Sequence, residues 1–237
     1  MITYSLIIPV NNEQESLPVL MAEIDAVRRN LAGELEVIFI DDGSTDRSFD
    51  VLKELRDEYA YIRIIRFDKR YGQSSAFSEG FKSARGEIII TMDADLQNDP
   101  GDILKLLEFY PDYDVITGKR TRRRDSIIKI LSSKIANSAR NWLTDEDIVD
   151  TGCSLKIFSG RYVKNLKLYE GLHRFLPTLC KLEGAKVIEV EVSHRERRFG
   201  KTHYGIGNRL FRSLNDAFAV RWMKKRAMRY KIERRIE

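Results

Sequence analysis

Two aspartates separated by one residue, Asp93 and Asp95, are the side chains of this sequence best suited to chemistry. They follow directly after the apolar run 88–90, which is typical of a buried β-strand. A strand that carries two carboxylates at its carboxyl end offers hard oxygen ligands to a divalent cation, and such a cation can hold a nucleotide diphosphate. The sequence therefore predicts a nucleotide-activated substrate.

Polar side chains also follow two earlier apolar runs. Asn11 and Glu13 come after the first run, and Asp41 and Asp42 come after the second. In an open α/β sheet, nucleotides bind at the carboxyl ends of the strands, where these side chains would gather. Each set alone is also typical of a turn or a helix cap, but three such sets in succession favour one common binding site.

The order of the expected elements supports this placement. Apolar runs alternate with segments of helical periodicity through the first half of the chain. We expect strands at 4–9, 35–40, 62–67, 87–91 and 113–117, and helices at 17–30, 47–59, 74–84 and 103–109. Beyond these we expect a basic loop at 119–125, helices at 127–143, 172–182 and 206–230, and strands at 154–158 and 186–192. The alternation predicts an α/β fold with a mostly parallel, doubly wound sheet flanked by helices.

The composition is that of a globular chain with one core. Of the 237 residues, 43% are hydrophobic and 32% are charged, which suffices for a single domain with an appendage. Cys153 and Cys180 lack the spacing of metal ligands and follow no secretory signal, so we expect free thiols in a reducing compartment. No apolar run approaches the ~20 residues that span a bilayer, so we expect no integral membrane segment.

The net charge of +5 is unevenly distributed. Residues 194–237 hold fourteen Lys or Arg and four Asp or Glu, so this part carries +10 and the rest of the chain carries −5. A strongly basic tail on an acidic body favours contact with a polyanion, either nucleic acid or an anionic membrane surface.

Taken together, the motifs resemble those of family 2 glycosyltransferases with the GT-A fold. Within that family the chain is similar to the dolichol-phosphate mannosyltransferase branch, which transfers a sugar from a nucleotide sugar to a polyprenyl phosphate. The resemblance covers residues 3–205 and rests on segments 8–13, 40–46, 84–87, 92–100, 118–120, 150–153 and 194–204. It implies an inverting, metal-dependent transferase of cell envelope biosynthesis that uses a UDP- or GDP-sugar and an undecaprenyl or dolichyl phosphate.

The resemblance also implies which residues contact the nucleotide-sugar donor. Residues at the ends of the first two strands would frame the base and the ribose, and residues at the end of the fourth strand would face the diphosphate. The implied donor set is Pro9, Asn11, Glu13, Asp41, Asp42, Gln73, Asp93, Ala94 and Asp95.

The metal site implied by the resemblance consists of Asp93, Asp95 and Gln97. These residues would hold Mg²⁺ or Mn²⁺ against the diphosphate, where the cation acts as a Lewis acid on the leaving group. Catalysis would then depend on the two aspartates together with Arg120 and Arg197. The alternative, that the aspartates cap the next helix, is disfavoured because capping normally uses one side chain.

The acceptor phosphate would be received by Arg120, Lys129 and Ser133. Lys129 and Ser133 are four residues apart and would share one face of the helix at 127–143. Many relatives have Arg where this chain has Lys129, and an ammonium group gives a point contact in place of a bidentate one. The neighbouring run 122–124 is either part of this site or a solvated loop.

An acceptor that is itself a phosphate needs no strong general base. A phosphate monoester has a second pKa near ~6 and is largely ionised at neutral pH, so alignment and electrostatics are the main requirements. The histidines at 173 and 194 lack ligand spacing and are expected to pack or to form hydrogen bonds. Arg197 begins a segment that, in the family, closes over the diphosphate; Thr202 and His203 depart from the family's usual Ser and Lys there.

The tail places apolar side chains at a four-residue spacing, with Lys and Arg around them. The apolar positions are Ile206, Leu210, Leu214, Phe218 and Trp222. We expect either a helix that lies in a membrane interface or a helix packed on the catalytic domain. We therefore divide the chain into a catalytic domain at 1–205 and a basic amphipathic tail at 206–237.

Many relatives continue after this point into transmembrane helices. We expect this chain to be cytoplasmic and peripheral at the inner face of the membrane, bound to anionic lipid or to a separate membrane subunit. A homo-oligomer is also compatible with the sequence.

Other functions compete with this one. A related transferase acting on another glycan or lipid-linked acceptor remains open. A processive polysaccharide synthase would have Gln-x-x-Arg-Trp, but Phe218 stands where the Gln should be. A sugar-nucleotide pyrophosphorylase would have a Gly-rich loop after the first strand, but this chain has Asn11-Asn12-Glu13 there. A nonenzymatic nucleic-acid-binding protein is disfavoured, and no nucleic acid partner is expected, because acidic strand ends repel phosphates.

Overall fold

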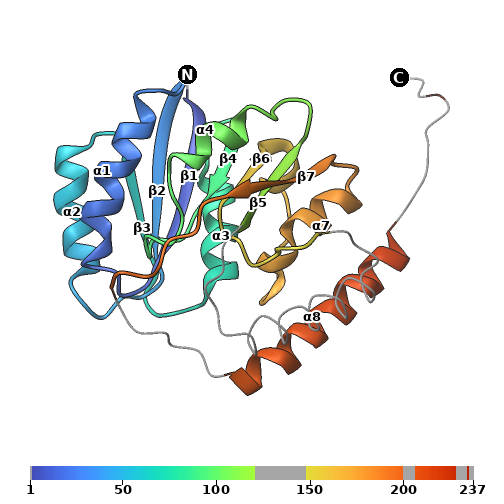
Figure 1. Ribbon diagram of the computed structural model, residues 1–237. Coiled ribbons are helices and arrows are strands. Elements are labelled where there is room, and N and C mark those ends of the chain that lie inside the picture. Colours follow the sequence, from blue (N-terminus) through green and yellow to red (C-terminus); the bar gives the residue numbers. More distant parts are fainter. Residues whose placement is uncertain (1, 121–147, 200–205, 228–233, 235–237) are drawn as a thin grey trace.

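A seven-stranded sheet forms the centre of the part of the chain that the structure describes, with strand order β3-β2-β1-β4-β6-β5-β7 (Figure 1). The structure is a computed structural model, and it describes residues 2–120, 148–199, 206–227 and 234. The strands are β1 (Ile2–Val10), β2 (Glu34–Asp41), β3 (Ile62–Arg66), β4 (Ile88–Thr91), β5 (Val115–Arg120), β6 (Lys156–Ser159) and β7 (Val187–Val192). The helices are α1 (Ser16–Arg28), α2 (Ser48–Glu58), α3 (Gln73–Ser83), α4 (Asp102–Leu107), α6 (Gly160–Val163), α7 (Leu176–Leu182) and α8 (Ile206–Arg226), with a 3₁₀-helix η1 (Leu172–Phe175) before α7.

The sheet is parallel except at β6. The pairs β1–β2, β1–β4, β2–β3 and β5–β7 are parallel, whereas β6 runs antiparallel between β4 and β5. Ile157 lies opposite both Ile90 and Ile116 in this register. The mostly parallel sheet predicted from the sequence is confirmed. The antiparallel direction of β6 was not predicted, since partner and direction depend on contacts between residues far apart in sequence.

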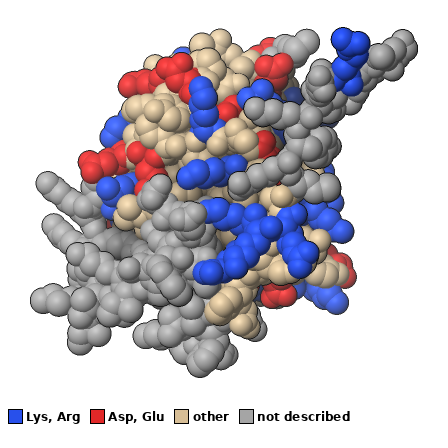
Figure 2. All heavy atoms as spheres, turned by 90° about the vertical axis from the view of Figure 1, so that its right-hand side faces the viewer, with Lys and Arg blue, Asp and Glu red and all other residues tan. Residues whose placement is uncertain are grey.

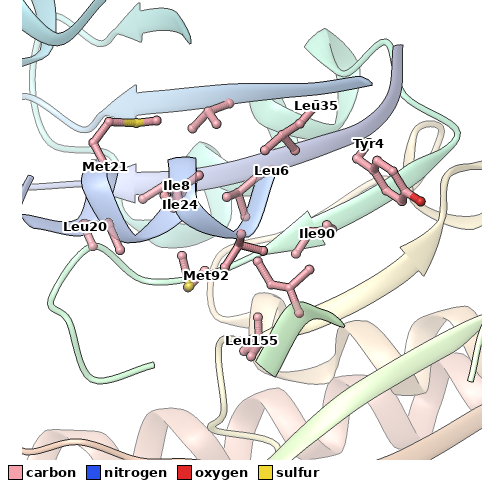
Figure 3. Packing of buried hydrophobic residues seen from close by; sticks show 14 of the residues in the cluster. Tyr4, Leu6, Ile8, Leu20, Met21, Ile24, Leu35, Ile90, Met92 and Leu155 are labelled. Atoms are coloured by element: carbon pink, nitrogen blue, oxygen red, sulfur yellow. The ribbon is translucent and has the colours of Figure 1, made fainter. Parts of the chain in front are cut away.

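Helices cover both faces of the sheet and bury its apolar runs. Leu6 and Ile8 face α1, α2 and α4, while Ile7 faces the opposite side with α3, α6 and α7. All three side chains are fully buried, and Figure 3 shows Leu6 and Ile8 packed among Met21, Ile24 and Ile90. Burial of such a side chain contributes about 2 kcal/mol. Because both faces are covered, the strands read as continuous apolar runs, which is why their positions were predictable.

The helix α8 lies outside this sandwich and packs against η1 and α7 (Figure 1). Ala217 and Val220 on α8 are fully buried against a cluster from η1 and α7 made of Leu172, Phe175 and Leu179. On the other side of the same helix, two aromatic side chains are exposed. Helix α8 therefore packs on the catalytic domain and also exposes two aromatic side chains, Phe218 and Trp222.

In the described part of the chain, no helix combines the length and the apolarity needed to cross a bilayer. The helix predicted at 127–143 lies outside the described residues.

A hydrogen bond between His173 and Ser74 joins η1 to α3. The Ser74 hydroxyl lies 2.7 Å from Nδ1 of His173 and accepts a hydrogen bond from the backbone N–H of Gly171 over 3.1 Å. Burial, and then the nearby Arg174 charge, lower the pKa of His173 to about 3. This histidine is a packing and hydrogen-bonding group, as predicted.

Stability should consequently fall as the pH drops below the unfolded-state pKa of histidine, about 6.5. Between that value and a pH of about 3, the unfolded chain takes up a proton at His173 that the folded chain does not. From pH 7.5 to 5.5 we expect a loss of about 1.4 kcal/mol from this group. The measurement is urea unfolding at both pH values for the natural chain and for His173→Gln, which lacks the imidazole. An equal pH dependence of the two proteins would contradict the assignment.

Candidate active site

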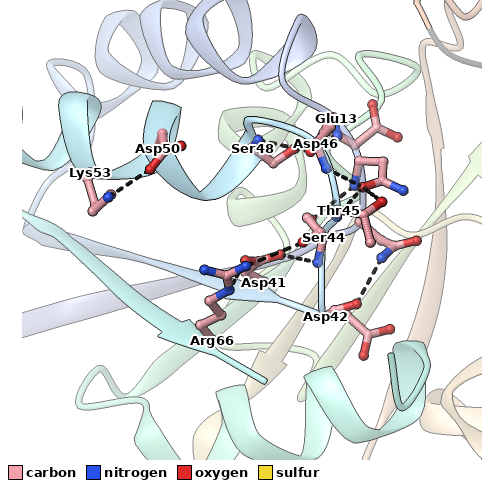
Figure 4. Close-up of polar contacts among 12 residues, drawn as sticks. Glu13, Asp41, Asp42, Ser44, Thr45, Asp46, Ser48, Asp50, Lys53 and Arg66 are labelled. Atoms are coloured by element: carbon pink, nitrogen blue, oxygen red, sulfur yellow. Dashed lines mark hydrogen bonds and ion pairs between the residues drawn. The ribbon is translucent and has the colours of Figure 1, made fainter. Parts of the chain in front are cut away.

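The loops that follow β1 and β2 are tied to each other by side-chain hydrogen bonds (Figure 4). Asn12 has a φ angle of +60°, and its side-chain oxygen accepts a hydrogen bond from the Thr45 N–H over 2.8 Å. The hydroxyls of Ser44 and Ser48 accept hydrogen bonds from the backbone N–H groups of Asn12 and Glu13, over 3.1 and 2.8 Å. These contacts hold Glu13 at the carboxyl edge of the sheet.

The two aspartates predicted to frame the base and ribose already have partners within the protein. Asp42 accepts hydrogen bonds from the backbone N–H groups of Tyr71 and Gly72, over 2.6 and 2.9 Å. Asp41 is fully buried, and its Oδ2 lies 3.2 Å from Nε of Arg66. This is an ion pair without hydrogen-bond geometry, so Oδ2 has no hydrogen bond among the described residues. Both carboxylates shape the loops, and their contact with the donor stays a prediction.

The chain around Asp42 permits close approach between the loops. Asn11 donates its side-chain amide to the Asp42 carbonyl oxygen over 2.8 Å. Gly43 has a φ angle of +64°, and a Cβ atom there would lie 2.4 Å from the Lys69 backbone. Pro9 is the penultimate residue of β1. The first two strand ends and the loop before α3 therefore form one continuous edge.

Asp93 is the first carboxylate after β4, and it contacts both α3 and the segment before β6. Gln73, the first residue of α3, donates its side-chain amide to Oδ1 of Asp93 over 2.6 Å. The Asp93 N–H donates to the Ser154 hydroxyl over 3.2 Å. Burial, and then the charge of Asp95, raise the pKa of Asp93 to about 6. The ionised form of such a carboxyl group is favoured by a nearby cation.

Asp95 is nearly buried and forms an ion pair with Arg197. One guanidinium nitrogen lies 2.6 Å from Oδ2, and the Gln97 N–H donates to Oδ1 over 3.1 Å. Glu13 belongs to the same group of charges. Its pKa is raised, mainly by burial, with the two nearby aspartates adding to the rise and Arg197 opposing it. The predicted site residues from the first, third and fourth strand ends thus converge here with Arg197.

The chain offers a cation two carboxylates at this point. Within the described residues, no group of three or more His, Cys, Asp or Glu side chains is arranged as a metal site. Neither Asp93 nor Asp95 caps α4, because the N-cap of that helix is Gly101 and no side chain forms a capping hydrogen bond there. Mg²⁺ is commonly bound through one or two carboxylates, with substrate phosphates and waters completing the coordination. The pair therefore fits a cation that arrives with a diphosphate.

Arg120, the last residue of β5, forms a bidentate ion pair with Asp150. Its Nε and Nη2 each lie 2.7 Å from an oxygen of that carboxylate, and Glu189 on β7 accepts the Asp150 N–H over 2.8 Å. Burial tends to lower the pKa of Arg120, but the hydrogen bonds and charge of Asp150 outweigh it, so the pKa is raised. Asp93 also acts on Arg120 electrostatically. Lys129 and Ser133, the other predicted acceptor residues, lie outside the described residues.

Several residues around the aspartate pair were missed by the sequence analysis. Ser154 also accepts a hydrogen bond from the Asn98 side chain over 2.7 Å. Lys156 is buried, its pKa is lowered by burial, and its ammonium group donates to the Cys153 carbonyl oxygen. The available signal was their position just after segment 150–153, which carries part of the resemblance.

Arg195 was also missed, and it anchors the segment that carries Arg197. Its N–H donates to the Gln97 carbonyl oxygen over 2.9 Å. Its guanidinium lies 2.7 Å from the carboxylates of both Glu23 and Asp99. The segment after β7 is therefore fastened to the loop after β4. Gln97 contributes backbone contacts here, and its role as a metal ligand stays a prediction.

Comparison with known proteins agrees with this geometry. Residues 5–165, more than half of the chain, match the glycosyl transferase family 2 domain. The chain belongs to glycosyl transferase family 2. The predicted family is confirmed.

Two curated relatives of this chain have names that refer to polyprenyl phosphates. The chain is 39% identical over 202 residues to the undecaprenyl-phosphate 4-deoxy-4-formamido-L-arabinose transferase of Pectobacterium carotovorum subsp. carotovorum (strain PC1), covering 84% of this chain and 62% of the relative. It is 34% identical over 233 residues to the dodecaprenyl-phosphate galacturonate synthase of Rhizobium johnstonii, covering 96% of this chain and 68% of the relative. The chain thus spans less than two thirds of the length of the first relative.

Solved structures confirm the fold of this family 2 chain. Glucosyl-3-phosphoglycerate synthase from Mycobacterium tuberculosis, in complex with Mn²⁺, UDP-glucose and phosphoglyceric acid, superposes with a TM-score of 0.70. The identity is 15%, and the match covers 93% of this chain and 80% of that chain. The same synthase in complex with Mg²⁺ and UDP gives a TM-score of 0.62 at 18% identity, covering 84% of this chain and 72% of that chain. The predicted GT-A fold class is confirmed.

The family 2 chain also has a cavity away from the aspartate pair. It measures about 320 Å³ and lies between α3 and the segment before η1, where Ser74, Ser78, Tyr71 and Tyr169 line it. Neither the aspartates nor Arg197 line this cavity. The site is therefore assigned from the converging charges at the strand ends and not from the shape of this hollow.

Proposed function

We propose that this chain is an inverting, metal-dependent glycosyltransferase that moves a sugar from a UDP- or GDP-sugar to a polyprenyl phosphate. The observation that carries the proposal is the arrangement of the Asp93–Asp95 pair between two arginines, Arg197 and Arg120. It supplies one place for a diphosphate with its cation and a second cationic group for an anionic acceptor. The names of the relatives support polyprenyl phosphate as that acceptor.

The donor side of the mechanism depends on preorganised carboxylates. When bound by Asp93 and Asp95, Mg²⁺ or Mn²⁺ would neutralise the charge that builds on the leaving nucleoside diphosphate. Gln73 fixes Asp93, and the Gln97 N–H fixes Asp95. Because these hydrogen bonds exist before substrate binds, little reorganisation is needed in the transition state.

The acceptor side needs orientation of a group that is already nucleophilic. A phosphate oxygen forms a bond to the anomeric carbon from one face while the bond to the diphosphate oxygen breaks on the other, so the configuration inverts and no side chain has to remove a proton. In this proposal Arg120, oriented by Asp150, positions the acceptor phosphate. Lys129 and Ser133 stay as predicted partners of that phosphate.

The decisive test is transfer of radiolabelled sugar from a panel of UDP- and GDP-sugars to undecaprenyl phosphate in detergent, with Mg²⁺ or Mn²⁺. A labelled lipid product that disappears with EDTA would establish the reaction and name the donor. Donor binding without lipid labelling would disprove the proposed acceptor and favour the other lipid-linked or glycan acceptors. Absence of donor binding would overturn the proposed activity.

We also propose that α8 holds the enzyme on an anionic membrane at its inner, cytoplasmic face. Phe218 and Trp222 are 58% and 65% exposed, and the last turn of α8 holds Lys224, Lys225 and Arg226. Figure 2 shows the side of the molecule toward which the C-terminal end of α8 points, and Lys and Arg gather in the middle of it. Aromatic side chains beside basic ones suit an interface between acyl chains and anionic headgroups.

Replacement of the two aromatics should therefore weaken membrane binding. We expect Phe218→Ser with Trp222→Ser to reduce binding to phosphatidylglycerol-containing vesicles at least about tenfold, since each buried aromatic contributes on the order of 1.5–3 kcal/mol. Co-sedimentation with vesicles measures this. Ala219→Ser is the matched control on the exposed side of the same helix. Unchanged binding of the double variant would assign the attachment to another surface of the chain, whereas failure of the natural chain to bind vesicles would favour a separate membrane subunit.

A further inference from the structure

We infer that Arg197 is a stand-in cation, which occupies the Asp95 carboxylate until a divalent cation binds there and then turns to the donor diphosphate. The inference rests on the proposed function, because it assumes that the aspartate pair receives a metal–diphosphate complex. It goes further by giving one arginine two successive partners. It also predicts that the free enzyme disfavours a bare metal ion.

Both oxygens of Asp95 have partners in the protein, and one of these partners is the cationic Arg197. Oδ1 accepts the Gln97 N–H over 3.1 Å, whereas Oδ2 lies 2.6 Å from the guanidinium. Asp93 and Glu13 add negative charge around the same point, and both act on Arg197 electrostatically. A group of carboxylates this close together needs cations around it. Arg120 and Lys156 act electrostatically on Asp93, and Arg197 is the cation that contacts Asp95.

The arginine is the partner able to move. Its side chain is 31% exposed, against 8% for the Asp95 side chain. Its backbone stays near the site because Arg195, two residues earlier, is fastened to Gln97 and to Asp99. Release of the ion pair would therefore leave the guanidinium solvated and close to the position of a bound diphosphate, for which a planar guanidinium is well suited.

The ion pair at the Asp95 carboxylate has a thermodynamic consequence. The guanidinium of Arg197 and a divalent cation on the same carboxylate would repel each other, so the ion pair lowers the apparent affinity of the free enzyme for metal. A nucleoside diphosphate gives the released guanidinium a new partner. Metal and nucleotide should therefore bind cooperatively, each increasing the affinity for the other by the same factor.

Binding of Mn²⁺ followed by electron paramagnetic resonance tests this without any turnover. The titrations use the full chain, with and without UDP or GDP, and protein-free samples correct for Mn²⁺ held by the nucleotide alone. We expect Arg197→Ala to bind Mn²⁺ about tenfold more tightly than the natural chain when nucleotide is absent, as for loss of a competing charged hydrogen bond. The cooperativity between Mn²⁺ and nucleotide should fall in the same variant.

Two controls separate the ion pair from general charge. Arg198→Ala removes an equal charge at the next, exposed position and should leave the Mn²⁺ affinity unchanged. Arg197→Lys keeps the charge and should give an intermediate affinity. Equal Mn²⁺ affinities for the natural chain and Arg197→Ala would overturn the inference while the proposed transferase function stands. Failure of the natural chain to bind Mn²⁺ even with nucleotide would overturn both the inference and the proposed metal site.

Discussion

The variant Asp95→Asn is expected to lower the rate of sugar transfer about a thousandfold while the protein stays folded. The amide cannot replace the carboxylate charge that holds the cation against the leaving diphosphate. The Gln97 N–H can still donate to the remaining side-chain oxygen, and Arg197 is exposed enough to be solvated once its partner is neutral. The measurements are the initial rate at saturating donor and the thermal unfolding temperature.

A nearby aspartate provides the control for this variant. Asp99 pairs with Arg195 and accepts the Gly101 N–H, and it belongs to the same loop without being part of the aspartate pair. Asp99→Asn should keep its rate within about tenfold of the natural chain, as expected for a residue that only supports the loop. A rate loss for Asp95→Asn that is no greater than this would remove Asp95 from the proposed mechanism.

The variant Asp150→Asn should lose both stability and transfer. Arg120 and Asp150 have side chains that are 16% and 9% exposed, so the change leaves a largely buried guanidinium without its counter-charge. Breaking a buried pair in this way costs about 3 kcal/mol or more. Urea unfolding measures the stability, and the transfer assay measures the loss of a positioned Arg120.

A double variant distinguishes the two effects. Arg120→Met combined with Asp150→Asn removes the buried charge as well as its partner, so we expect part of the lost stability to return. Transfer should not return, because the proposed contact to the acceptor phosphate is absent. Recovery of transfer in the double variant would show that Arg120 is not needed for the acceptor.

The strands and the carboxylates were predictable from the sequence for one physical reason. Strands buried on both faces must be apolar throughout, and the polar residues that follow them must then gather at one edge of a parallel sheet. This logic located Asp93, Asp95 and Glu13, whose carboxylates interact electrostatically with one another in the structure.

Contacts between distant segments were not predictable in the same way. The bond from Asp93 to Ser154 joins residues 61 positions apart, and the pair of Arg195 with Glu23 joins residues 172 apart. Such contacts depend on the antiparallel insertion of β6 and on the return of the chain after β7, and neither has a local signal. The role of Asp150, whose partner Arg120 lies 30 positions earlier, was missed for the same reason.

The packing contact of α8 with η1 and α7 limits how the chain can be truncated. Ala217 and Val220 cover Leu172, Phe175 and Leu179, so a protein cut at the predicted boundary near residue 205 would expose these apolar side chains to water. Such a truncated enzyme would be prone to self-association through that patch, whatever its remaining fold. The α8 helix thus covers part of the core and is also the proposed point of attachment to the membrane. Removal of the helix would abolish both roles at once.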